Sequence, residues 1–127
     1  MSYPFNAQSG LIVVRATVFG PTGSLIVRLA LDTGATMSSL SIEQLMMLGY
    51  DPSQSIDRVQ VATGSGTEFV PRIEISRFEA LGNQRESMMV LAHTLPATTK
   101  IDGLLGLDFL RGGRITIDFL KATITLS

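Results

Sequence analysis

The 127-residue chain has no cysteine, which excludes disulfides, thiolate metal sites and a cysteine nucleophile. It has one histidine, His93, so no site within it can use several histidine ligands. Its ten basic residues nearly balance its eleven acidic ones, without the basic excess that is typical of nucleic-acid binding. It also has no apolar run of the roughly 18 residues that a membrane span needs. We therefore expect no metal, no cofactor, no nucleic-acid partner and no membrane span.

The first residues show neither the basic segment nor the apolar segment of a signal peptide, so we expect a cytoplasmic protein. The length fits one domain, expected over residues 1–127, with a core that needs no covalent cross-links. Apolar residues make up 45% of the chain although aromatic residues make up only 6%. Many are β-branched and lie in short runs between glycines, which predicts an all-β fold.

Runs of alternating apolar and polar residues, separated by turn residues, predict four hairpins. They are 11–19 with 24–31, 58–62 with 67–75, 73–78 with 86–91, and 115–119 with 122–126. A short helix should begin at Ser41, with Gln44 completing a capping box, and a second helical turn is expected at 107–111. Met46 and Met47 on the first helix are expected to fill the core.

The triplet Asp32-Thr33-Gly34 directly follows an apolar strand. By itself it is an ordinary turn sequence, because aspartate and glycine both favour turns. The next residue, Ala35, has a small side chain that suits a crowded site. The position at the end of a buried strand makes Asp32 a candidate catalytic carboxylate.

A second motif lies 70 residues further on, where an apolar pair, Leu104-Leu105, is followed by Gly106 and the short helix. Strand 115–119 comes next. In this order over residues 10–126, the motifs resemble the retropepsin-like aspartic proteases. The resemblance is closest to the bacterial single-domain members and to the protease domain of eukaryotic DNA-damage-inducible ubiquitin-shuttle proteins.

The resemblance implies a closed β-barrel with one or two short helices that carries half of an active site. It gives Asp32 the catalytic role, a hydrogen bond across a twofold axis to Thr33, and a substrate-binding carbonyl to Gly34. Leu104 and Leu105 would be buried behind the Asp32 loop, and Gly106 would permit a tight crossing there. The substrate would be covered by a flap made of Ala62, Thr63, Gly64, Ser65, Gly66 and Thr67.

Peptide hydrolysis of this kind needs two carboxyl groups that share a proton, so that one activates water while the other acts as an acid. Asp32 is the one aspartate of the chain in an Asp-Thr-Gly context. A second copy must therefore supply the second Asp32, which predicts a homodimer that cleaves a peptide or protein. The mechanism needs neither a metal nor another cofactor.

The sequence departs from the retroviral members at two positions. Where they have an acidic residue after the Ala of the motif and a basic residue after the later Gly, this chain has Thr36 and Leu107. Both ends of that ionic contact are absent, so we expect another support for the loop. Asp108 is a candidate to cap or brace the last helix, and His93, in a polar loop, is expected to be an ordinary surface residue.

Two other functions fit the same residues. The first is a catalytically weak or inactive module of the same fold that grips an extended peptide without cutting it. The second is a purely structural dimerisation domain in which Asp32 is only a turn residue. An Asp32 substitution, tested with a peptide library, separates the three functions.

Overall fold

The computed structural model describes residues 1–127, apart from the side chain of Thr63. Over this described part the chain forms ten β-strands, two short α-helices and two 3₁₀ turns. The strands are β1 (Ser2–Pro4), β2 (Val13–Gly20), β3 (Gly23–Leu31), β4 (Ser39–Leu40), β5 (Arg58–Thr63), β6 (Gly66–Ala80), β7 (Asn83–Ala92), β8 (Gly103–Leu105), β9 (Ile115–Asp118) and β10 (Thr123–Leu126). The helices are α1 (Ile42–Met47) and α2 (Leu107–Leu110), and the turns are η1 (Pro52–Gln54) and η2 (Ala97–Thr99).

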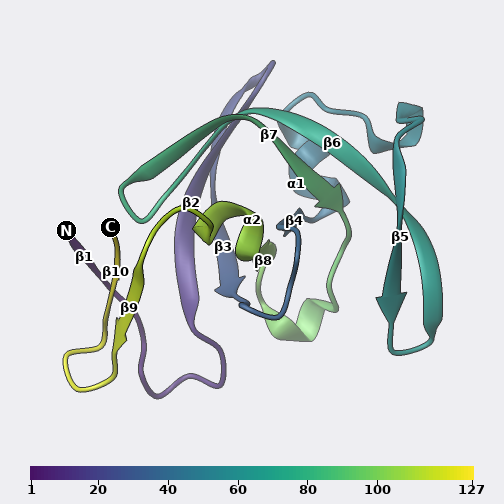
Figure 1. Ribbon diagram of the computed structural model, residues 1–127. Helices are drawn as coiled ribbons and strands as arrows, with labels where there is room; N and C mark the ends of the chain where they lie inside the picture. Colours follow the sequence, from purple (N-terminus) through teal and green to yellow (C-terminus); the bar gives the residue numbers. More distant parts are fainter.

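Six of the strands close into a barrel in the order β2-β3-β8-β4-β7-β6, with β6 pairing back onto β2. The remaining strand of this sheet, β5, pairs with the first part of β6, and the two project from the barrel as a hairpin (Figure 1). A separate sheet, β1-β10-β9, lies beside the two termini on the opposite side of the molecule (Figure 1). The expected all-β, closed-barrel fold with two short helices is confirmed.

The β2–β3 hairpin shows how alternation in the sequence builds the barrel wall. Val14, Ala16 and Val18 are buried, whereas Arg15 between them is exposed. Because side chains of a strand alternate between its faces, this pattern directs one face of β2 into the core. The turn ends at Gly23, whose φ of 140° is one that L side chains rarely adopt. The structure therefore confirms this predicted hairpin.

Strand β6 differs from the prediction. The sequence suggested that 67–75 and 73–78 belong to two separate hairpins, but the structure has one strand of 15 residues from Gly66 to Ala80. Its first part pairs with β5 and its second part with β7. No glycine interrupts it after Gly66, although its burial does not alternate throughout: the buried Val70 and Ile73 are three positions apart, where the pairing changes from β5 to β7. A single continuous strand thus joins the projecting hairpin to the barrel.

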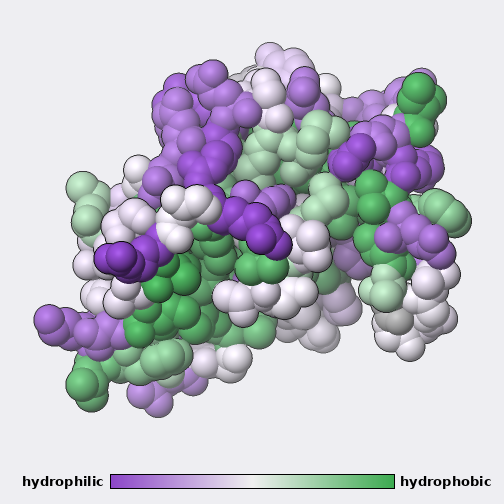
Figure 2. All heavy atoms as spheres, in the orientation of Figure 1, coloured by the Kyte–Doolittle hydropathy of each residue, from purple (hydrophilic) through white to green (hydrophobic). Residues whose placement is uncertain are grey.

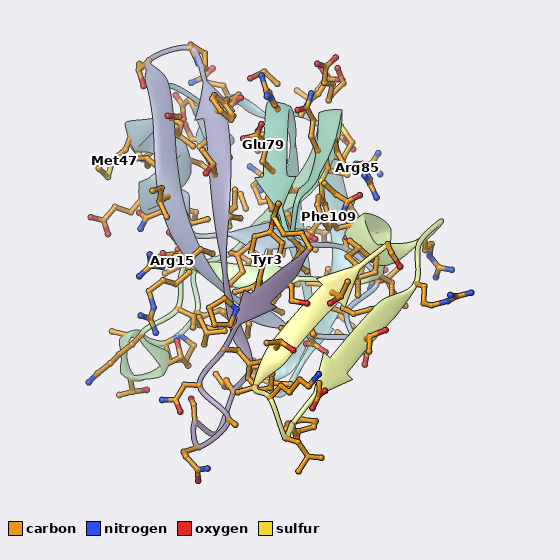
Figure 3. All side chains as sticks on the ribbon, turned by 90° about the vertical axis from the view of Figure 1, so that its left-hand side faces the viewer. Tyr3, Arg15, Met47, Glu79, Arg85 and Phe109 are labelled. Atoms are coloured by element: carbon orange, nitrogen blue, oxygen red, sulfur yellow. The ribbon has the colours of Figure 1, made fainter. Side chains whose placement is uncertain are left out.

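Helix α1 begins as predicted but packs differently. The Ser41 hydroxyl accepts a hydrogen bond from the Gln44 backbone N–H at 3.3 Å, which confirms the N-cap. The Gln44 side chain does not complete a capping box, because its amide donates to the Asp102 carboxylate at 2.8 Å. Met46 and Met47 were expected in the core, and this is wrong: both are exposed, and Figure 3 shows Met47 pointing outward. A helix of six residues buries only one face, here through Leu45.

Candidate functional site

Asp32 lies where β3 ends and the chain turns away from the sheet. Its backbone N–H donates to the Leu105 carbonyl at 2.9 Å, which extends the parallel pairing of β3 with β8 by one bond. Its carboxylate is half-buried, and Oδ1 accepts the Gly34 N–H at 2.8 Å. The main chain of Asp32 is therefore held by the barrel, while its side chain bonds back to the loop at residues 32–38, named the Asp32 loop below.

The small residues of this loop are required by close contacts. A Cβ on Gly34 would lie 3.2 Å from Asp32 Oδ1, so glycine gives the carboxylate room. Ala35 donates its N–H to the Asp32 carbonyl at 3.2 Å and accepts from Leu107 N–H at 2.8 Å. Thr33 is exposed, and its hydroxyl bonds to none of the described residues of the chain. The loop is thus tight on its inner side and open at Thr33.

Strand β8 passes directly behind the Asp32 loop. Leu105 is fully buried, as expected, but Leu104 is only half-buried, because it faces a cavity rather than the core. Gly106 lies so close to the loop that an added Cβ would be 2.6 Å from the Ala35 carbonyl oxygen. A Cβ on Gly103 would likewise overlap the Ser39 carbonyl oxygen. The crossing predicted at Gly106 is present, and glycine is the residue that permits it.

A hydrogen-bonded network that the sequence did not reveal ties the loop to α2. Ser38, which is fully buried, donates its hydroxyl to Asp108 Oδ1 at 2.7 Å and its backbone N–H to Asp108 Oδ2 at 2.9 Å. The same hydroxyl accepts the Gly106 N–H at 3.0 Å. Asp108 also accepts the N–H of Phe109. Because Thr36 and Leu107 are uncharged, the Asp32 loop was expected to have a support other than an ion pair between these positions. This network is such a support.

Helix α2 is fixed from its other end by β7. The Arg85 guanidinium donates to the Phe109 carbonyl at 2.8 Å and lies over the Phe109 ring, 4.8 Å from its centroid. Figure 3 shows the two side chains together beside the helix. A cation at a helix C-terminus satisfies carbonyl groups that lack partners within the helix. Asp108 and Arg85 therefore hold the two ends of a helix that is only four residues long.

The residues expected to form a flap lie at the end of the β5–β6 hairpin. Ala62, Gly64 and Thr67 are exposed there, with Ser65 and Gly66 in and after the turn. The side chain of Thr63 lies outside the described residues. Pairing runs from Arg58 and Pro71 to Thr63 and Gly66, so the turn is tighter than the predicted one at 63–66.

The base of this hairpin carries an ion pair. Arg72 donates through Nε and Nη2 to the two carboxylate oxygens of Asp57, at 2.8 and 3.2 Å. These hydrogen bonds, and the charge attraction with them, raise the pKa of Arg72 above its usual value. The Arg72 N–H also donates to the Asp57 carbonyl at 2.8 Å. Side-chain and main-chain bonds together thus fix the direction in which the hairpin leaves the barrel.

A cavity of about 670 Å³ lies between the Asp32 loop and the hairpin. In Figure 2 the hairpin projects on the right-hand side, with a hollow between it and the body of the molecule. Asp32 itself is not part of the wall, but its neighbours Gly34 and Ala35 are. The full wall is Gly34, Ala35, Thr36, Met37, Ser39, Val59, Gln60, Val61, Ala62, Val70, Leu91, His93, Leu95 and Leu104. The cavity is therefore mostly apolar and opens beside the candidate carboxylate.

His93 was expected to be an ordinary surface residue, and its position corrects that expectation. It follows β7, is half-buried and belongs to the cavity wall. The sequence held no signal for this, because the loop around it is polar and most of the wall comes from the Asp32 loop and the β5–β6 hairpin, which are distant in the chain. Among the described residues, the structure brings Asp32, the hairpin and His93 to one side of the barrel.

Comparison with known proteins gives one family and one fold. The model of the family described as "gag-polyprotein putative aspartyl protease" matches residues 23–112, a range that includes the Asp32 loop, the hairpin and α2. No curated protein matches the chain. Among solved structures, the chain is similar to a retropepsin-like aspartic protease from Rickettsia conorii, with a TM-score of 0.74 and 20% identity. That match covers 99% of this chain and 88% of the other. At this identity it shows a shared fold.

Proposed function

The chain belongs to the gag-polyprotein aspartyl protease family, and from this we propose that it is a homodimeric aspartic endopeptidase, with half an active site in each chain. The observation that carries the proposal is the contrast between Asp32 and the other aspartates. Asp32 is partly exposed beside the cavity, and its Oδ2 accepts no hydrogen bond from the described residues. A carboxylate left in this condition is available to substrate, to water and to a second carboxylate.

The other aspartates are all occupied in holding the structure together. Each accepts hydrogen bonds from groups of its own chain, and none of them lies in an Asp-Thr-Gly sequence. Asp51 accepts from Ser53, Asp57 from Arg72, Asp102 from Arg28 and Gln44, Asp108 from Ser38, and Asp118 from Leu120 and Lys121. A second catalytic carboxyl group is therefore expected from a second copy of Asp32.

Two features support pairing with a second copy, one at the Asp32 loop and one at the terminal sheet. Thr33 is exposed next to Asp32 and has no partner among the described residues, so it is free to bond across a twofold axis. The outer edges of β1 and β9 in the terminal sheet are also unpaired within the described chain. Unpaired strand edges are templates for pairing with another chain. In a symmetric dimer the two loops would meet and bring the two Asp32 carboxyl groups together.

The chemistry follows from that meeting. Two carboxyl groups about 3 Å apart do not both ionise, so one proton is shared between them. The ionised member takes a proton from a water molecule as the water attacks the scissile carbonyl carbon. The protonated member gives its proton to the carbonyl oxygen. Collapse of the resulting tetrahedral species, with protonation of the departing nitrogen, releases the two peptide products without a covalent enzyme intermediate.

The apolar cavity and the hairpin account for peptide binding. An extended peptide lying between the Asp32 loop and the hairpin would form strand-like hydrogen bonds with the main chain of both. One of its side chains would enter the cavity of about 670 Å³. The small tip residues Gly64 and Gly66 would let the hairpin close over the peptide. The structure is thus suited to an endopeptidase that accepts unfolded or extended segments.

The test uses wild-type protein and Asp32→Asn with a mixed peptide library, analysed by mass spectrometry. The amide keeps the shape of the carboxyl group without its charge, so we expect cleavage to be lost while the fold and dimer persist. Near wild-type cleavage by purified Asp32→Asn would refute the assignment. Peptide capture without cleavage by the wild type would favour the binding module, and neither capture nor cleavage would favour a structural dimerisation domain.

A further inference from the structure

The cavity beside the Asp32 loop is apolar except at a few positions. Val59, Val61, Leu91 and Leu104 form much of its wall, and each can pack against methylene groups. Of the residues that line it, His93 is the one with an ionisable side chain. A polar group in an apolar pocket selects among ligands. A ligand that cannot hydrogen-bond to this group displaces the water bound to it and leaves the group unpaired, which weakens binding.

The main chain holds His93 in place while its ring stays unoccupied. The His93 backbone N–H donates to the Leu40 carbonyl at 2.9 Å, continuing the pairing of β7 with β4 past Ala92. Within the described part of the chain, no hydrogen bond or ion pair involves the imidazole. The residue is half-buried. A side chain with a fixed backbone and an unbonded imidazole, which offers at least one N–H donor, is suited to bind a ligand in the cavity.

The charged residues near the cavity, unlike His93, are not part of its wall. Arg72 and Asp57 at the base of the hairpin neutralise each other. Glu68 pairs with Val61 in the hairpin register, but it is exposed and not part of the cavity wall. The remaining polar wall residues, such as Thr36 and Gln60, carry no charge. Among the residues of the cavity wall, His93 is therefore the one whose side chain can carry a charge, while the Asp32 carboxylate lies beside the cavity and outside its wall.

We infer that His93 is a specificity-determining residue that selects, at one substrate position, a side chain with an apolar stem and a terminal hydrogen-bond acceptor. Glutamate fits this description best, because its methylene groups meet the leucine and valine wall and its carboxylate meets the ring nitrogens. Glutamine should follow, and lysine should be rejected, because the cavity wall offers no carboxylate to pair with a buried ammonium group. The inference rests on the proposed function in one respect, namely that a peptide occupies the cavity.

The expected effect is about tenfold in preference for glutamate over an uncharged side chain of similar length, which is typical of a single hydrogen bond to a charged group. The lysine peptide should be disfavoured by a further factor of about ten. Methionine, with a similar length and no strong acceptor, is the natural apolar reference.

The experiment measures both cleavage and binding. Short peptide mixtures, each with one position fixed as Glu, Gln, Met or Lys, are tested at mildly acidic pH against wild type, His93→Gln and His93→Leu. kcat/KM is compared for cleavage, and Kd for binding to Asp32→Asn protein, which reports on the cavity even if no cleavage occurs. Lys121→Gln is the matched control, because it removes one exposed positive charge from the β9–β10 turn, which lies on the side opposite the β5–β6 hairpin in Figure 1 and contributes no residue to the cavity wall.

We expect wild type and Lys121→Gln to prefer Glu over Met at one position, in kcat/KM or in Kd. In His93→Leu the preference should reverse in favour of Met, whereas His93→Gln should keep part of the Glu preference through its amide donor. The inference is overturned if Glu and Met are equivalent in wild type at every position, or if His93→Leu retains the Glu preference. Peptides that bind but are not cleaved would count against the proposed endopeptidase while still testing His93. If no peptide binds or is cleaved, both fail.

Discussion

Replacing the buried Ser38 by alanine should destabilise the protein by about 3 kcal/mol, although the change removes a single oxygen atom. The hydroxyl donates to the Asp108 carboxylate at 2.7 Å, a charge-assisted hydrogen bond that contributes about 1.5–3 kcal/mol. It also accepts the buried N–H of Gly106 at 3.0 Å, and leaving a buried donor unpaired costs about 1–3 kcal/mol. The two effects share one atom and are not additive, so we take about 3 kcal/mol as their combined size. That is a large part of a typical folding free energy of about 5–15 kcal/mol.

The chain offers a matched control for this change. Ser53 also donates its hydroxyl to an aspartate, Asp51, at 2.6 Å, but that pair is exposed at the start of a 3₁₀ turn. Exposed pairs contribute little because water replaces the lost bond, so Ser53→Ala should cost less than about 1 kcal/mol. Asp108→Asn, which keeps the acceptor for the Ser38 N–H, should cost about 1–2 kcal/mol.

The measurement is urea unfolding followed by circular dichroism, at one protein concentration because dimerisation would add to apparent stability. Peptide cleavage is measured alongside, and Ser38→Ala should lower kcat more than it raises KM, because the network positions the loop rather than the substrate. The reasoning is refuted if Ser38→Ala and Ser53→Ala unfold within about 0.5 kcal/mol of each other at equal m-values.

Three further changes test other parts of the site. Specific activity should fall on dilution, and a sedimenting monomer that stays fully active would contradict a shared site. Gly106→Ala should lower the unfolding free energy by more than about 3 kcal/mol, because its Cβ would press on backbone, whereas Gly10→Ala, with open space around it, should change it little. Arg72→Gln should speed hydrogen exchange in the hairpin. Because Asp57 raises the pKa of Arg72, the arginine should stay charged, and the ion pair intact, until the pH rises past arginine's normal range. Hairpin exchange in the wild type that becomes faster between about pH 7 and 10, after correction for intrinsic rates, would contradict this role of the ion pair.

Local features of the sequence were enough to predict most of the barrel. All four predicted hairpins are present as strand pairs, because residues that alternate every second position and end at turn residues leave few other structures open. The prediction was wrong in one respect: the strands expected at 67–75 and 73–78 are a single strand, β6, which pairs first with β5 and then with β7. The Asp32 loop and the tight crossing at Gly106 were also predicted, each from a contiguous motif.

Contacts between residues far apart in the chain could not be predicted in this way. Ser38 and Asp108 are 70 positions apart, and although the sequence marked Asp108 as a candidate brace for the last helix, it gave no sign that Ser38 is its partner. They meet because β3, β8 and β4 pair side by side, which brings the Asp32 loop against the start of α2. Local propensity carries no information on such a pairing, so the loop's support was expected only in general terms.

The position of His93 in the cavity wall could not be predicted for the same reason. This residue and the Ser38–Asp108 pair show what the sequence by itself determined and what only the tertiary structure decided. The sequence determined the strands, the turns and a candidate carboxylate, and it led to the expectation of a second chain, because these depend on residue order and on the single Asp-Thr-Gly. Only the folded barrel decided which buried polar groups support that carboxylate and that His93 lines the adjacent cavity. The physical reason is that a side chain's surroundings depend on strands that are neighbours in the sheet and distant in the chain.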